Sequence, residues 1–115
     1  MFKLISTVVT RDQIKEYAKA SGDFNPIHTD LEAAKKAGLQ DCIAHGMLIM
    51  ALGSSAIREW GVQSVKTYDV RFQSMTYPDE PLVLKGQWTD EGAGKGLITV
   101  ENEEGEIKMK GTFTV

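Results

Sequence analysis

The sequence has little of several features that define other classes of protein. Its 115 residues include one cysteine, Cys42, and two histidines, and its charges sum to −3. A single cysteine excludes an intramolecular disulfide, and without a run of like charges no surface for nucleic acid is indicated. The longest apolar run, 47–52, is far shorter than the roughly 18 residues of a membrane span. We therefore predict neither a nucleic-acid partner nor membrane association.

The sequence also shows no targeting signal and no linker. The first residues, MFKLISTVV, lack both a long apolar stretch and a small-residue cleavage site, which favours a reducing cytoplasm. There are no repeats, low-complexity tracts or Pro/Gly linkers. A chain of this length buries roughly 65% of the surface that its unfolded form exposes, which suits one domain with a modest core. We expect a single domain over residues 1–115.

The first half of the chain has helical features. A helix is predicted over residues 11–20 with Thr10 as its N-cap, and a second over 31–37 with Asp30 as its N-cap. Residues 23–29 are then an ordered connection between two short helices.

A third helix is predicted from about Cys42 to Trp60. Residues 47–57 show almost no polar face apart from Ser54 and Ser55, and a helix that is apolar nearly all round must be enclosed.

The second half alternates with the period of a β-strand. Strands are expected near residues 67–73, 82–88, 97–101 and 107–115, joined in part by turns at 90–96 and 102–106, with a further strand within 2–9. Antiparallel strands around one enclosed helix describe an α+β protein with the hot-dog fold, a curved antiparallel sheet wrapped around a central helix. Because such a sheet has exposed edges, we expect a homodimer.

The stretch SGDFNPIH, residues 21–28, admits two interpretations. Ser-Gly can end a helix and Asn-Pro favours a turn, so the histidine can be incidental. Alternatively, Asp23 and His28 form an acid/base pair that the rigid Asn25-Pro26 turn fixes in place. A second stretch, IAHGM at 43–47, favours the alternative. The first amides of the enclosed helix lack intrahelical acceptors, and no side chain at Gly46 blocks access to its N–H, as an oxyanion-hole donor requires.

Together these two stretches closely resemble the hydratase motif of the MaoC-like, (R)-specific enoyl-thioester hydratases and dehydratases, which are hot-dog proteins. The resemblance covers nearly the whole chain. It implies that Asp23 and His28 are a catalytic dyad, that the amide of Gly46 binds the thioester oxygen, and that Ser54 is a supporting polar residue. The implied substrate is an acyl-CoA or an acyl-carrier-protein thioester, without a metal or other cofactor.

The chemistry explains why these residue types are needed. Hydration of a trans-2-enoyl thioester requires a hydroxyl at C3, a proton at C2 and stabilisation of charge on the thioester oxygen. Asp23, His28 and Gly46 supply these functions. An apolar acyl tunnel is also required, and Met47 and Phe72 are candidates to line it, although methionines at helical spacing are also common in ordinary cores.

Other interpretations stay open. A metal site built from Asp23, His28, Asp30 and His45 has no supporting spacing, and His45 is better explained as positioning the helix start. Cys42 as a nucleophile competes with Cys42 as a small buried hydrophobe.

Two further functions compete with the hydratase. One is a hot-dog thioester hydrolase, in which water attacks the carbonyl carbon in place of C3. The other is a non-catalytic subunit that only binds acyl thioesters.

Overall fold

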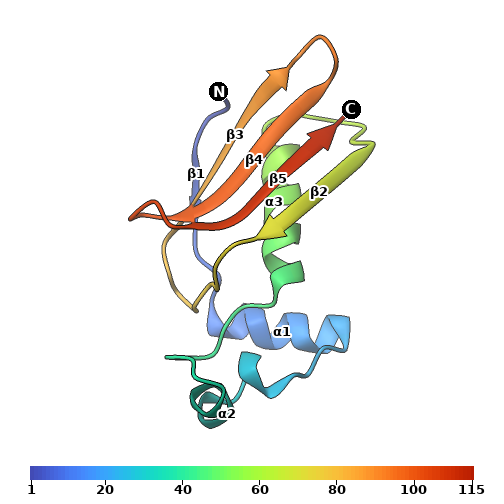
Figure 1. The fold of residues 1–115 in the computed structure, drawn as a ribbon. Helices are drawn as coiled ribbons and strands as arrows, with labels where there is room; N and C mark the ends of the chain where they lie inside the picture. The colour runs from blue at the N-terminus through green and yellow to red at the C-terminus, as the bar shows by residue number, and fades with distance from the viewer.

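A five-stranded antiparallel sheet and one long helix packed on its inner face organise the computed structural model, which describes residues 1–115 (Figure 1). The strands are β1 (Ile5–Thr7), β2 (Thr67–Phe72), β3 (Leu82–Asp90), β4 (Lys95–Asn102) and β5 (Ile107–Thr114), in the spatial order β1-β3-β4-β5-β2. Hairpins join β3 to β4 and β4 to β5, as the turn sequences predict. β2 therefore lies at one edge of the sheet, paired with β5 on one side only.

The long helix, α3 (Gly46–Glu59), packs against the apolar face of the sheet. Alternate strand residues supply that face: Leu82, Leu84, Ile98, Val100, Met109 and Phe113 are all at most 1% exposed. From the helix, Ile49 and Ile57 enter the same core. Each such side chain contributes roughly 1.5 to 3 kcal/mol when fully buried.

Gly53 lets the helix lie close to the sheet. A Cβ at this position would overlap the Tyr68 hydroxyl and stand 2.9 Å from Cε of Met109.

Three short helices gather at the N-terminal end of α3: α1 (Arg11–Ser21), the 3₁₀-helix η1 (Pro26–His28) and α2 (Leu31–Lys36) (Figure 1). Their predicted caps are present. The Thr10 hydroxyl accepts from the amide of Gln13, and the Gln13 side chain accepts from the amide of Thr10. The Asp30 carboxylate accepts from the amides of Glu32 and Ala33. The segment 22–30, which contains η1 and joins α1 to α2, is thereby placed beside the N-terminal end of α3.

The predicted start of the third helix at Cys42 is wrong. Residues 42–45 are not helical, and α3 begins at Gly46. The amide of Ile43 donates to the carbonyl of Ile27 (3.1 Å) and the amide of Ala44 donates to that of Thr76 (2.8 Å). These bonds to η1 and to the 73–81 loop replace the helical ones.

The prediction that α3 is enclosed on all sides is also wrong for the single chain. Met47, Ala51, Ser54 and Ser55 are exposed on the side away from the core. The sheet therefore covers one side of the helix and leaves the other open. Neither α3 nor any other helix is both long and apolar enough to cross a bilayer.

Candidate active site

Local hydrogen bonds shape the loop that carries Asp23. Gly22 ends α1 with φ +77°, in the left-handed region that favours glycine. The carboxylate of Asp23 accepts from the amide of Asn25 (3.2 Å), and the side chain of Asn25 accepts from the amide of Ile27 (3.3 Å). Asn25 is thus the N-cap of η1, with Pro26 as its first residue. In the single chain Asn25 supports the turn that presents His28.

The dyad residues face each other across a gap. Nε2 of His28 lies 4.0 Å from Oδ2 of Asp23, too far for a direct hydrogen bond and suited to a bridging water. The His28 side chain is 9% exposed and that of Asp23 is 53% exposed. The His28 side chain is therefore enclosed by protein, while the Asp23 side chain is in contact with solvent.

A second contact sets the tautomer of His28. Its Nδ1 lies 2.8 Å from the carbonyl oxygen of Ile43, which can only accept. Nδ1 therefore carries the proton, and in the neutral ring Nε2 presents a lone pair toward Asp23. Both groups that face the gap are acceptors, so a water molecule there can donate one proton to each.

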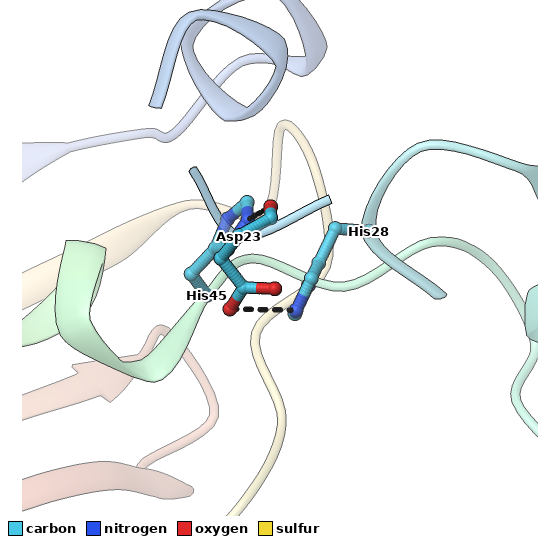
Figure 2. A group of neighbouring side chains, drawn as sticks. All are labelled: Asp23, His28 and His45. Carbon is cyan, nitrogen blue, oxygen red and sulfur yellow. Dashed lines mark hydrogen bonds and ion pairs between the residues drawn. The ribbon is translucent and has the colours of Figure 1, made fainter. Parts of the chain in front are cut away.

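His45 packs directly behind the dyad. Its Nε2 lies 3.1 Å from the main-chain oxygen of Asp23, and its ring stacks on that of His28 with centroids 3.7 Å apart (Figure 2). His45 is only 2% exposed. From the sequence His45 was assigned to the helix start, and it is indeed the N-cap residue of α3. Its contacts with Asp23 and His28 have no signal in the sequence, because they depend on how three segments fold together.

Gly46 occupies the first position of α3. Neither its amide nor that of Met47 donates to a backbone carbonyl, as is general for the first amides of a helix. Phe72 covers this point, since a Cβ at position 46 would lie 3.2 Å from Cε2 and Cζ of its ring. The donors predicted for a thioester oxygen are thus unpaired, and an aromatic ring stands beside them.

A pocket of about 210 Å³ opens at Gly46. It is lined by Ile43, Ala44, Gly46, Ile49, Phe72, Ser74, Met75, Thr76 and Lys108. Phe72 lines it, as expected for an acyl site, whereas Met47 is 59% exposed and does not. Asp23 and His28 are not part of its wall, so one chain alone does not form a continuous tunnel from dyad to pocket.

Ser54 is not brought to the dyad. It is exposed on α3 and lines a different pocket, of about 480 Å³, with Arg58 and residues 62–65. At 1.5 Å per residue, the eight positions from Gly46 place it about 12 Å farther along the helix. The supporting role that the resemblance implies for Ser54 therefore finds no contact within the single chain.

Lys108 is a residue of this region that the sequence does not reveal. The alternation of β5 predicts an outward side chain, yet Lys108 is 2% exposed. Its ammonium group donates to Glu106 (2.7 Å), Glu80 (2.9 Å) and the carbonyl of Met75 (2.8 Å). The 73–81 loop covers it, and the same loop supplies the Thr76 carbonyl that holds Ala44. Lys108 thus anchors a loop that positions the segment before Gly46.

Ionic contacts keep this cluster charged despite its burial. Burial alone would lower the pKa of Lys108, but hydrogen bonds to Glu106 and Glu80 hold it above its usual value. Burial likewise would raise the pKa of Glu80, but its bond from Lys108 and other hydrogen bonds hold it below its usual value.

The geometry speaks against the two competing chemistries of this region. Ligand atoms of Asp23, His28 and His45 lie within 4.8 Å of one another, but the two rings are stacked 3.7 Å apart and inclined by only 20°. Their lone pairs therefore lie in two nearly parallel planes, and one ion cannot lie in both. Carbonyl oxygens also engage Nδ1 of His28 and Nε2 of His45. Cys42 is 3% exposed, and burial raises the pKa of its thiol, which disfavours a nucleophile.

Comparison with known proteins places this geometry in a family. The family model described as MaoC like domain matches residues 3–110. The 3-hydroxyacyl-thioester dehydratase X of Mycobacterium tuberculosis is 36% identical over 97 residues, covering 82% of this chain and 32% of that protein. Fatty acid synthase subunit beta of Saccharomyces cerevisiae is 34% identical over 101 residues, covering 83% of this chain and 5% of that protein. The chain thus spans a third or less of these two curated relatives.

Solved structures confirm the predicted α+β hot-dog fold. A MaoC-like dehydratase from Phytophthora capsici superimposes with a TM-score of 0.85 at 30% identity, covering 97% of this chain and 39% of that one. An (R)-hydratase from A. caviae gives a TM-score of 0.81 at 18% identity, covering 98% and 91%, a likeness that shows the fold alone. Because the family model matches nearly the whole length of this chain, the chain belongs to the MaoC-like domain family.

Proposed function

We propose that this chain catalyses the (R)-specific hydration of trans-2-enoyl thioesters, or the reverse dehydration of (R)-3-hydroxyacyl thioesters. The observation that carries the proposal is the gap between two acceptors, Nε2 of His28 and the carboxylate of Asp23, 4.0 Å apart. The 36% identical relative named as a 3-hydroxyacyl-thioester dehydratase supports the reaction class.

The reaction begins with a water molecule that donates one hydrogen bond to His28 and one to Asp23. His28 removes a proton through Nε2 while the water oxygen bonds to C3 of the enoyl chain. The π electrons move toward the thioester carbonyl, whose oxygen becomes negatively charged. The proton on Nε2 then passes to C2, so that one hydroxyl and one proton have been added in total.

The start of α3 stabilises the charge that builds on the thioester oxygen. The unpaired amide of Gly46 supplies a donor, and the positive end of the helix dipole adds to it. Acid/base assistance contributes roughly 3 to 5 kcal/mol and one oxyanion donor roughly 3 to 4 kcal/mol. Binding the acyl chain and the water in reacting geometry must supply the remainder, for which about 7 to 11 kcal/mol is possible.

The substrate is proposed to be an acyl thioester of coenzyme A or of a carrier protein, handled in the cytoplasm without a metal or other cofactor. The pocket beside Gly46 is lined mainly by apolar residues, which suits the acyl part. A homodimer fits the open edge of β2, the exposed side of α3 and the separation of the pocket from the dyad in one chain. Measurement of the mass in solution by light scattering tests the dimer, and a monomeric mass would reject it.

The decisive experiment incubates the purified protein with crotonyl-CoA and follows the loss of the conjugated-enone absorbance, with product chirality determined afterwards. Asp23→Asn and His28→Ala are tested beside it, with Glu103→Gln as an exposed carboxylate control. We expect (R)-3-hydroxybutyryl-CoA from the wild type and the control, and a large loss of rate in the two site variants.

Product analysis separates the competing functions. Release of free thiol without a 3-hydroxyacyl thioester would identify a thioester hydrolase. Binding of the thioester without turnover would identify a non-catalytic subunit. Undiminished turnover in both site variants would remove Asp23 and His28 from the chemistry.

A further inference from the structure

We propose that His45 is a positioning residue of this site: its ring holds the main chain at Asp23 and supports the ring of His28, while its backbone begins the helix that carries Gly46. The inference rests on the proposed function. It assigns to one buried residue the relative placement of the three groups that act on the substrate.

The hydrogen bond to Asp23 fixes the tautomer of His45. The main-chain oxygen of Asp23, 3.1 Å from Nε2, can only accept, so Nε2 carries the proton and donates. Nδ1 is buried and has no hydrogen-bond partner. The ring of His45 therefore makes one hydrogen bond, to the main-chain oxygen of Asp23, and that bond sets the orientation of the ring.

Ring packing transmits this orientation to His28. The two imidazoles are inclined by 20° at a centroid distance of 3.7 Å, and Tyr17 of α1 contacts the His45 ring with centroids 4.9 Å apart. The ring of His28 is held by one hydrogen bond, from Nδ1 to the carbonyl of Ile43. Packing against neighbouring side chains must therefore limit the rotation of this ring. The His45 ring is the aromatic surface that limits it.

The backbone of the same residue begins α3. The carbonyl of His45 accepts from the amides of Leu48 (3.0 Å) and Ile49 (3.3 Å), the first hydrogen bonds of the helix. Side chain and backbone of one residue thus connect Asp23 and the unpaired amide of Gly46. At 2% exposure His45 is enclosed by protein, so it acts through Asp23 and His28 and not on substrate.

Apart from this contact, Asp23 is held only by bonds within its own loop, where its carboxylate accepts from the amide of Asn25 (3.2 Å). The Asp23 side chain is 53% exposed, and the amide of Asp23 bonds only to the hydroxyl of Ser21 (3.2 Å). Loss of the His45 donor would allow the carboxylate to move away from the water that it shares with His28. Misplacement of about 1 Å can reduce a rate by about 100-fold.

Two substitutions separate the hydrogen bond from the ring. His45→Phe keeps an aromatic ring and removes the donor, whereas His45→Gln keeps an N–H donor and removes the ring. We expect kcat to fall about 10- to 100-fold in His45→Phe, with KM within about threefold of wild type, and to recover at least about threefold from that level in His45→Gln. Unchanged kcat in a folded His45→Phe protein, or equal losses in both variants, would overturn the inference.

Two measurements need no activity, and the first of them needs no variant. Long-range ¹⁵N–¹H correlation spectra distinguish the two nitrogens of each ring, and we expect the proton of His45 on Nε2. Hydrogen exchange of the 22–28 segment should be faster in His45→Phe than in His45→Gln. A proton on Nδ1 would overturn the inference. If the wild type fails to hydrate any enoyl thioester, the proposed function is rejected, while the tautomer and the exchange rates still decide the role of His45.

Discussion

His28 and His45, the two histidines of the chain, lie ring against ring with centroids 3.7 Å apart, and their hydrogen bonds differ in kind. His28 donates through Nδ1 to Ile43 and keeps Nε2 free for the gap beside Asp23. His45 donates through Nε2 to the main chain of Asp23. In the proposed mechanism the first ring exchanges a proton, and the second holds its surroundings in place.

In the proposed mechanism Asp23 and His28 act on one water molecule, so their substitutions should not be additive. Each single variant, Asp23→Asn or His28→Ala, is expected to lower kcat about 10²- to 10⁴-fold. The double variant should be no more than about tenfold slower than the slower single variant, because the shared step is already lost. Initial rates with crotonyl-CoA measure this. Fully multiplicative losses would show that the two groups work in separate steps.

Gly46→Ala tests access to the first amide of α3. Its added Cβ would lie 3.2 Å from the Phe72 ring, so that ring must shift or the helix start must move. We expect kcat/KM to fall about 10- to 100-fold, with partial recovery when Phe72→Leu is added. Gly92→Ala is the matched control, since its Cβ would meet nothing closer than 3.7 Å. Normal kcat/KM in Gly46→Ala would indicate that the thioester oxygen lies elsewhere.

Lys108→Met tests the buried ion cluster through stability. Removal of the ammonium group leaves the partly buried Glu80 carboxylate without its cation, and breaking such a pair costs about 3 to 5 kcal/mol. The neighbouring Lys110 is exposed, so Lys110→Met should change the free energy of unfolding by less than about 0.5 kcal/mol. Urea denaturation compares the two. Equal stabilities would show that the cluster contributes little to folding.

Tyr68→Phe should change how stability depends on alkaline pH. Burial raises the pKa of Tyr68 to about 12, and its hydroxyl donates to the carbonyl of Met50 (2.8 Å). The unfolded value is about 10, so the tyrosine's contribution is complete below about pH 10 and is lost as pH rises through the folded value.

We therefore expect the phenylalanine variant to be about 1 kcal/mol less stable than wild type near neutral pH. The difference should shrink at about pH 11, measured by urea midpoints at the two pH values. A constant difference would contradict the burial of a neutral hydroxyl at this position.

Most of the fold could be predicted from local patterns in the sequence. Alternation along 107–115 and the caps at Thr10 and Asp30 follow from contacts between residues close in sequence, and the structure has them, except that Lys108 breaks the alternation. The start of α3 was misplaced because the amides of Ile43 and Ala44 bond to Ile27 and Thr76, far away along the chain. Such competition between loops leaves no trace in a helical periodicity.

The candidate site was predictable where it lies on one short loop. Asp23 and His28 are five residues apart, and the Asn25-Pro26 turn between them limits their separation. Lys108 was missed because its burial depends on a loop, 73–81, that is remote in sequence. Ser54 was grouped with the dyad by resemblance, although eight helical positions separate it from Gly46 within the chain.

The proposed reaction should depend on Gly53, although this buried position lies away from the proposed site. Because any side chain there would collide with Tyr68 and Met109, this glycine sets the height of α3 above the sheet. Gly46 is the first residue of the same helix, whereas Asp23 lies in the loop after α1 and His28 ends η1. A larger residue at 53 would lift the proposed oxyanion donor away from the proposed acid/base pair, and turnover should fall although every proposed reacting group was still present.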